Sequence, residues 1–231
     1  SSAASDVYKR QISDIEGALK ALAPVYEQSG GVDGFVSVEV DPALARDTER
    51  TTADARALHE LINAPNLMVK IPGTEEGLPS IRTMIGEGRS INVTLIFSVS
   101  RYVEVMEAYI SGLEDAVAAG QEDLSTIASV ASFFISRTDT EVDRRLEEVG
   151  SEDALSLRGK TAVAQAQVAY QRFVETFSGP RWDALSARGA QVQRPLWAST
   201  STKNPSYSQT LYVDELIGPD TVNTMPDNTI E

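Results

Sequence analysis

The sequence predicts an α/β protein, a (β/α)8 TIM barrel that is incomplete here, with about six βα units. Strand and helix patterns alternate along almost the whole chain, which is typical of a parallel sheet covered by helices. An open doubly wound sheet usually carries a G-x-G-x-x-G turn after its first strand, and the sequence contains none. Several strands also place polar residues on one face near their C-terminal ends, where a barrel forms its active site.

The composition excludes several classes of function. The 231 residues show no interior boundary, so a single domain over residues 1–231 is predicted. The net charge of −14 argues against nucleic acid and anionic membranes as partners. There is no cysteine, no signal-peptide pattern and no apolar run of membrane length, so the cytoplasm is the expected compartment. The single histidine, His59, falls in a helical stretch, which argues against a Ser-His-Asp triad or a histidine metal cluster.

The first predicted helix begins at Ser13, because Ser13-Asp14-Ile15-Glu16 has the spacing of a capping box. Gly30-Gly31 ends this helix. Residues 1–11 show no clear periodicity and are interpreted as an appended or disordered leader. Apolar residues recur along the helix at the required intervals: Ile15, Leu19, Leu22 and Tyr26.

The other elements follow from apolar periodicity and from the glycines and prolines between segments. The predicted strands span 35–40, 66–71, 91–97, 126–135, 196–199 and 221–224. The predicted helices span 48–62, 75–85, 100–119, 140–149, 155–177 and 209–216. One face of the helix over 100–119 is apolar and is expected in the core: Tyr102, Met106, Tyr109 and Leu113.

The number of strands is smaller than a closed barrel requires. Six strands are predicted, and a (β/α)8 barrel has eight. The chain opens in a helix without an initiating Met and ends at Glu231, where another helix is expected to start. These features predict a fragment that lacks the first two βα units and the final helix.

Lys70 is the strongest candidate for a catalytic residue. It lies near the end of an apolar strand that Pro72 and Gly73 stop, and an ammonium group is costly to desolvate there. Burial can bring a lysine amine toward neutral pH, where it is a usable nucleophile for a carbonyl substrate through a carbinolamine and a Schiff base. The alternative is a structural salt bridge across the barrel between Lys70 and Glu39.

Three polar residues are expected beside Lys70. Glu39 lies one βα unit earlier and faces the same interior, so a carboxylate and ordered water are expected to move protons. Asn92 and Thr94 share one face of their strand and are candidates to hold water or a substrate hydroxyl. Asn92, Thr94 and Ser132 are, on the alternative interpretation, ordinary hydrogen-bonded polar residues of the interior.

Two cations follow late strands of the predicted barrel. Arg137 comes after Ser132–Ser136, and Lys203 comes after Ala198–Thr202. Barrel enzymes often bind phosphate through their late βα loops, where a cation and hydroxyls meet a dianion. The alternative is that both are exposed loop cations, and for Lys203 the two interpretations have equal weight.

Taken in order, six segments of the chain resemble the transaldolase family, and the match runs from about Ile12 to the end. No one of them would be specific alone, but their order is. They are Val36–Pro42, Met68–Thr74, Ile91–Ser98, Ser132–Arg137, Arg194–Thr200 and Val222–Pro226. The form Trp197-Ala198-Ser199-Thr200 is similar to the longer bacterial branch.

The resemblance implies a barrel enzyme that moves a dihydroxyacetone unit between sugar phosphates in the non-oxidative pentose phosphate pathway, without a metal or organic cofactor. It implies that Lys70 forms the Schiff base and that Glu39 and Thr94 hold the catalytic water. It also implies that Asn92 and Ser132 contact substrate hydroxyls and that Phe134 is an aromatic residue of the pocket. Finally, it implies that Arg137 and Ser199 bind phosphate.

The chain departs from the family in three places. The family often has a second arginine just after the serine that matches Ser199, and here Ser201 and Lys203 stand nearby. The family's catalytic aspartate on the first strand and asparagine on the second have no counterpart, so the chain alone is expected to be nearly inactive.

Two alternatives stay open: a Schiff-base fructose 6-phosphate aldolase, and a non-catalytic barrel that binds sugar phosphates. Some relatives are fused to a sugar phosphate isomerase.

Overall fold

The computed structural model describes residues 2–231 and the side chains from residue 9 onward. Six strands alternate with helices along the chain, as the periodicity predicts. The strands are β1 (Val36–Glu39), β2 (Leu67–Pro72), β3 (Ile91–Ile96), β4 (Ser129–Phe134), β5 (Arg194–Ala198) and β6 (Val222–Asn223). The helices are α1 (Ser2–Gln28), η1 (Pro42–Leu44), α2 (Thr48–Ile62), α3 (Gly77–Gly86), α4 (Val99–Ala118), α5 (Ser136–Val149), α6 (Glu152–Ser156), α7 (Thr161–Thr176), α8 (Pro180–Ser186), α9 (Leu211–Asp214) and α10 (Asp227–Ile230).

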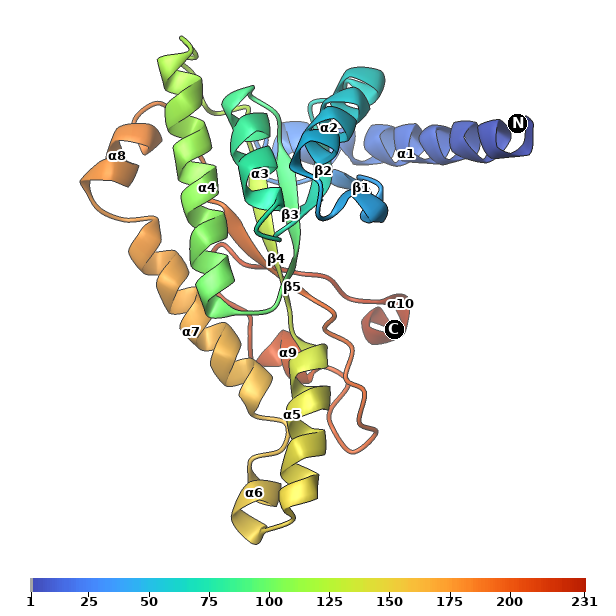
Figure 1. Ribbon diagram of the computed structural model, residues 1–231, viewed down its shortest axis with the longest axis vertical. Helices are drawn as coiled ribbons and strands as arrows, with labels where there is room; N and C mark the ends of the chain where they lie inside the picture. Colours follow the sequence, from blue (N-terminus) through green and yellow to red (C-terminus); the bar gives the residue numbers. More distant parts are fainter. Residues whose placement is uncertain (1) are drawn as a thin grey trace.

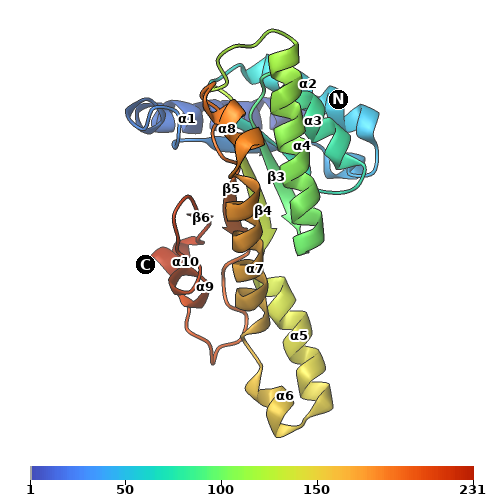
Figure 2. The ribbon, with the colours of Figure 1, turned by 90° about the vertical axis from the view of Figure 1, so that its left-hand side faces the viewer.

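The six strands form one parallel sheet in the order β1-β2-β3-β4-β5-β6, curled into part of a barrel. Figures 1 and 2 show α2, α3, α4 and α7 along one face of this sheet, while α1 projects away from its β1 edge. The α/β class and the partial barrel are therefore confirmed. Within residues 2–231 the sheet is not closed, because no ladder joins β6 to β1.

The interior has two parts, one on each face of the sheet. The larger part lies between the sheet and the helices and contains the predicted apolar face of α4, whose Tyr102, Met106, Tyr109 and Leu113 are all fully buried. A smaller apolar cluster lies on the concave face. Side chains alternate between the two faces along each strand, so β2 contributes Val69 to the larger cluster and Met68 to the smaller one.

Several elements differ from the sequence prediction. Helix α5 begins at Ser136 instead of 140, and strand β4 begins at Ser129 instead of 126. Helix α1 begins at Ser2 instead of Ser13, because no proline or glycine interrupts residues 2–16; residue 1 and the side chains of residues 1–8 lie outside the described residues, and whether 1–11 is a leader stays a prediction. The single helix predicted over 155–177 is split into α6 and α7 around Gly159, whose φ is +71°. Helix α8 starts with a proline at its first position, a start signal that the sequence prediction missed, and α10 ends the chain.

One arginine side chain links segments at the two edges of the curled sheet, near the N-terminal ends of the strands. Arg194 of β5 donates hydrogen bonds to the carbonyls of Val32, Asp220 and Thr221 at 3.2 to 3.3 Å. Val32 precedes β1, whereas Asp220 and Thr221 precede β6. The guanidinium therefore links the segments that lead into the two edge strands, and this link helps to keep the sheet curved.

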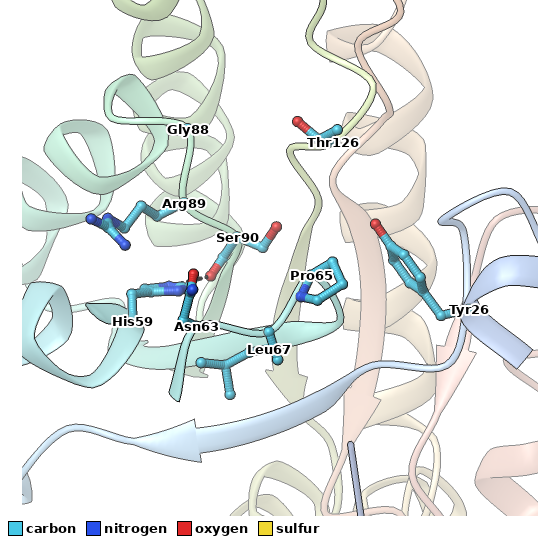
Figure 3. Close-up of a pocket in the computed structure, with 10 residues that line it drawn as sticks. Tyr26, His59, Asn63, Pro65, Leu67, Gly88, Arg89, Ser90 and Thr126 are labelled. Carbon is cyan, nitrogen blue, oxygen red and sulfur yellow. Dashed lines mark hydrogen bonds between the residues drawn. The ribbon is translucent and has the colours of Figure 1, made fainter. Parts of the chain in front are cut away.

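His59 is buried near the N-terminal ends of β2 and β3. Its Nε2 lies 3.0 Å from the carbonyl oxygen of Ser90, and Figure 3 shows this contact at the wall of a cavity of about 320 Å³. Burial is the main cause that lowers the pKa of His59 to about 4; the hydrogen bond to Ser90 opposes this shift, and the nearby Arg89 adds to it. The ring is therefore neutral at neutral pH and is a core residue rather than a catalytic base.

This burial predicts a pH-dependent stability. The pKa of His59 is about 4 when folded and about 6.5 when unfolded, so only the unfolded chain takes up a proton as the pH falls between these values. The contribution is fully present above about pH 7 and falls by about 2 kcal/mol between about pH 7.5 and pH 5. Urea unfolding of the chain and of His59→Gln at both pH values measures this change. An equal pH dependence in both proteins would contradict the assignment to His59.

Candidate active site

The sheet register places three predicted residues side by side on the concave face. Glu39 at the end of β1 is paired with Lys70 of β2, and Lys70 is paired with Asn92 of β3. Residues in register on neighbouring parallel strands point to the same face. Accordingly, the Nζ atom of Lys70 lies 2.5 Å from Oε1 of Glu39 and donates a hydrogen bond to it.

A chain of hydrogen bonds extends this group across the sheet. Asn92 donates from its Nδ2 atom to the hydroxyl of Ser37 at 3.0 Å, and Ser132 of β4 donates its hydroxyl to Oδ1 of Asn92 at 2.8 Å. Asn92 and Ser132 are buried, with 6% and 3% of their surfaces exposed. The amide is thereby held in one orientation. Ser37 was not predicted as a site residue, although it lies two residues before Glu39 on the same polar face.

The lysine and the asparagine line a cavity of about 380 Å³ on the concave face. Its other walls combine apolar residues such as Met68 and Leu196 with polar ones that include Asp33 and Arg194. The side chain of Lys70 is 26% exposed and that of Glu39 is 56% exposed. The amine is thus less buried than its apolar strand predicts, because the curled sheet is open on the side of β1 and does not enclose it.

Thr94 and the bulge that follows it lie at the end of β3. Thr94 is buried, with 6% of its surface exposed, and lies two residues after Asn92. The pairing with β4 shifts between Val93 and Ile96, and Leu95 within the shift has a φ of +58°. A non-glycine residue with this backbone conformation is uncommon and costs free energy. The strained residue lies directly beside the candidate site.

Arg137 is held by two aromatic rings at the C-terminal ends of β3 and β4. Its guanidinium carbon lies 5.1 Å from the ring centroid of Phe134 and 5.8 Å from that of Phe97. The two rings are 5.1 Å apart, and a guanidinium over aromatic faces is attracted by them. The arginine itself is exposed, so its charge is free to meet a ligand. Phe97 was not predicted as a site residue; it directly follows Ile96, the last residue of β3, and its spacing alone gives no signal.

Ser199 lies next to the start of the helix that carries Arg137. Its hydroxyl is 2.7 Å from that of Ser136, and the backbone N–H of Ser136 donates to the carbonyl of Ser199 at 3.0 Å. Ser199 has a φ of +53°, an uncommon backbone conformation for a residue with a side chain. The structure therefore brings the end of β5 to the first turn of α5.

Lys203 is not brought to the Lys70 cavity. It is exposed and lines a separate hollow of about 200 Å³ against the side of α5, together with Thr140, Arg144 and Tyr207. The segment after β5 turns along α5 instead of over the concave face, because Tyr207 and Tyr212 anchor it there. Of the two interpretations of Lys203, this placement favours an exposed loop cation.

The arrangement is suited to amine chemistry on a carbonyl compound. An amine beside a carboxylate can add to a carbonyl and exchange protons with it, and the buried amide and hydroxyls can accept and donate hydrogen bonds to a polyol. Within residues 2–231 no group of three or more histidine, aspartate or glutamate side chains is placed to hold a metal ion. No helix in the same range is sufficiently long and apolar to cross a membrane.

Comparisons with known proteins agree with this chemistry. Residues 3–231 match the family described as Transaldolase/Fructose-6-phosphate aldolase. A protein named Transaldolase from Thermobifida fusca is 60% identical over 218 residues, which cover 94% of this chain and 59% of that protein. Transaldolase 1 of Streptomyces avermitilis is 57% identical over 94% of this chain and 57% of its own length. A Transaldolase of Frankia alni is 55% identical over 95% of this chain and 59% of its own length.

The share of this chain that is matched differs from the share of the relatives' length that the chain spans. The chain spans less than two thirds of the length of these relatives. The family match, in contrast, runs over nearly the whole chain and does not bear out the expectation of a fragment.

Proposed function

The chain belongs to the transaldolase/fructose-6-phosphate aldolase family, and from this membership we propose that it transfers a dihydroxyacetone unit between sugar phosphates through a Schiff base on Lys70. The observation that carries the proposal is the contact between the Lys70 amine and the Glu39 carboxylate in a hollow lined by Asn92. The donors are ketose phosphates (sedoheptulose 7-phosphate or fructose 6-phosphate), and the acceptors are aldose phosphates (glyceraldehyde 3-phosphate or erythrose 4-phosphate).

The proposed reaction begins at the carbonyl carbon of the ketose. The Lys70 amine adds to this carbon, and the carbinolamine loses water to give a protonated Schiff base. The bond between C3 and C4 then breaks as the C4 hydroxyl gives up its proton and becomes the aldehyde of the leaving aldose. The bonding electrons pass to the iminium nitrogen, which leaves an enamine on Lys70. The enamine adds to the second aldehyde, and water returns to release the new ketose. Glu39 and Thr94 hold the water that carries protons in these steps.

The other residues hold the substrate in this proposal. Asn92 and Ser132 bind hydroxyl groups, and their mutual hydrogen bond keeps both oriented before the sugar arrives. Phe134 supplies an apolar wall and supports Arg137. Arg137 and Ser199 bind the phosphate, because a guanidinium and a hydroxyl at the C-terminal ends of neighbouring strands suit a dianion. Lys203 is given no role in the proposal, because it lines a separate hollow along α5 and not the Lys70 cavity.

Two assays distinguish the proposal from its rivals. Turnover of fructose 6-phosphate that requires an added aldose phosphate supports transfer, whereas equal turnover without an acceptor supports an aldolase that releases dihydroxyacetone. Binding of fructose 6-phosphate without a borohydride-stable adduct on Lys70 would support a non-catalytic binder. Mass spectrometry of the reduced protein locates the adduct.

Asn92→Ala tests the hydrogen-bonded chain on the concave face. The change removes the amide that joins Ser37 to Ser132, so the exposed Ser37 hydroxyl and the buried Ser132 hydroxyl both lose this partner. We expect capture of fructose 6-phosphate to require about 2 to 10 times more sugar, because one hydrogen bond between neutral groups contributes about 0.5 to 1.5 kcal/mol. Ser80→Ala, which removes a buried hydroxyl bonded to the Thr48 carbonyl outside the Lys70 cavity, is the matched control. Equal losses in the two variants would mean that Asn92 acts only on stability.

A further inference from the structure

Two buried aspartates lie one turn apart on α5, outside the candidate active site. Asp139 is 2% exposed and Asp143 is 8% exposed. They face the segment that follows β5 and the turn between α6 and α7. Within residues 2–231 neither carboxylate forms a salt bridge with a lysine or arginine. Two carboxylates buried without a cation are costly, so each needs other donors.

Each carboxylate receives one phenol and one backbone N–H. Tyr212 donates its hydroxyl to Asp139 at 2.5 Å, and the N–H of Ala162 donates to the other oxygen at 2.8 Å. Asp143 is bonded in the same way by a second tyrosine and by Gly159. Tyr207 donates its hydroxyl to Asp143 at 2.6 Å, and the N–H of Gly159 donates to the other oxygen at 2.9 Å.

The Tyr207 phenol remains a donor at neutral pH. Burial, together with the hydrogen bond to Asp143, raises the pKa of Tyr207 to about 12. Burial and the hydrogen bond to Asp139 raise the pKa of Tyr212 as well. Hydrogen bonds from such phenols to ionised carboxylates are stronger than those between neutral groups.

Few other hydrogen bonds hold the segment that follows β5. Residues 200–210 contain no helix or strand. In the described chain, Tyr207 is the one residue of 201–209 whose side chain forms a hydrogen bond beyond the adjoining Thr210. Just before the segment, Ser199 is bonded to Ser136 at the start of α5. The path of the chain from Ser199 to α9 therefore depends on α5.

Gly159 makes room for the Tyr207 ring. Its φ is +71°, and a Cβ atom at this position would lie 2.9 Å from the ring carbon Cζ of Tyr207. Real Cβ atoms essentially never approach another atom so closely, so a larger residue would displace the tyrosine. The glycine thus serves the docking of Tyr207 as well as the turn between α6 and α7.

We propose that Asp143 and Tyr207, supported by Asp139 and Tyr212, are positioning residues that hold the segment after β5 against α5 and so keep Ser199 beside Arg137. The phosphate-binding half of the site is then formed before a sugar phosphate arrives, and the ordering cost of that segment is not part of binding. None of the four residues touches the substrate. The inference rests on the proposed roles of Arg137 and Ser199.

Tyr207→Phe in the full chain tests this role, with Tyr170→Phe as the matched control. Like Tyr207, Tyr170 donates a hydrogen bond from its phenol, but its acceptor is the backbone carbonyl of Pro219 and not a residue of α5. Covalent capture on Lys70 is measured after borohydride reduction, with fructose 6-phosphate in one series and dihydroxyacetone, which has no phosphate, in the other. We expect Tyr207→Phe to raise the half-saturating concentration of fructose 6-phosphate about tenfold and to leave that of dihydroxyacetone unchanged. Amide hydrogen exchange of residues 201–209 should accelerate in this variant only.

The outcomes separate the two proposals. An unchanged half-saturating concentration of fructose 6-phosphate, or an equal rise for both sugars, would overturn the positioning role and leave the proposed function intact. Failure of the unaltered chain to be captured by either sugar would overturn the proposed function and this inference with it. Gly159→Ala, which displaces the Tyr207 ring without changing either hydrogen-bonding group, should reproduce the selective loss.

Discussion

Lys70→Met is expected to abolish covalent capture of fructose 6-phosphate. A thioether cannot add to a carbonyl, and no other amine lies against Glu39 within the described residues. Methionine has a similar length and keeps the contacts of the side-chain stem. After borohydride reduction, the labelled fraction measured by mass spectrometry should fall at least about 1,000-fold, because the reaction loses its nucleophile.

The fold of this variant should survive. Lys70 is 26% exposed and Glu39 is 56% exposed, so the carboxylate that loses its partner stays hydrated. The urea midpoint should therefore change little. Lys20→Met, a change of an exposed lysine on α1, controls for general loss of lysine and should label like the unaltered chain. Full labelling of Lys70→Met would place the Schiff base elsewhere.

Sustained transaldolase turnover by this chain is expected to be at least about 1,000-fold below that of the Thermobifida fusca relative. The reason is the open sheet: the carboxylate beside Lys70 is more than half exposed, and water weakens each electrostatic contact in the site. Removal of one preorganised group from an active site commonly costs a factor of about 100 to 1,000. The relative is 60% identical over the shared region, and the chain spans 59% of its length.

A coupled assay with fructose 6-phosphate and erythrose 4-phosphate measures both proteins under one set of conditions. Capture on Lys70, measured in parallel, shows whether the lysine of this chain is competent even where turnover is slow. Turnover within about tenfold of the relative would show that six strands suffice for the reaction, and the account based on exposure would be wrong.

Much of the fold could be predicted from the sequence because the relevant signals are local. Helix α2 begins and ends where the apolar periodicity places it, and Asp47 caps its start. All six strands were predicted, since each is a short apolar run bounded by glycine, proline or polar residues. The polar face shared by Ser37 and Glu39, and by Asn92 and Thr94, follows from the alternation of side chains along a strand.

The parts that were missed depend on contacts between distant segments. Phe97 supports Arg137 only because β3 and β4 end side by side, which its spacing in the sequence does not indicate. Lys203 follows a strand as a phosphate ligand would, but Tyr207 draws its segment toward α5. The split between α6 and α7 arises where Gly159 bonds to Asp143, sixteen positions earlier.

The amino-acid sequence by itself determined the class of fold, the number and order of the strands, and the residues whose chemistry suits a Schiff base, because hydrophobic periodicity and residue type are properties of short segments. Only the tertiary structure decided which of those residues meet. The register of β1, β2 and β3 brings Glu39, Lys70 and Asn92 together, and the incomplete closure of the sheet leaves the amine partly hydrated. Both depend on the packing of segments far apart in the chain, where long-range contacts outweigh local preference.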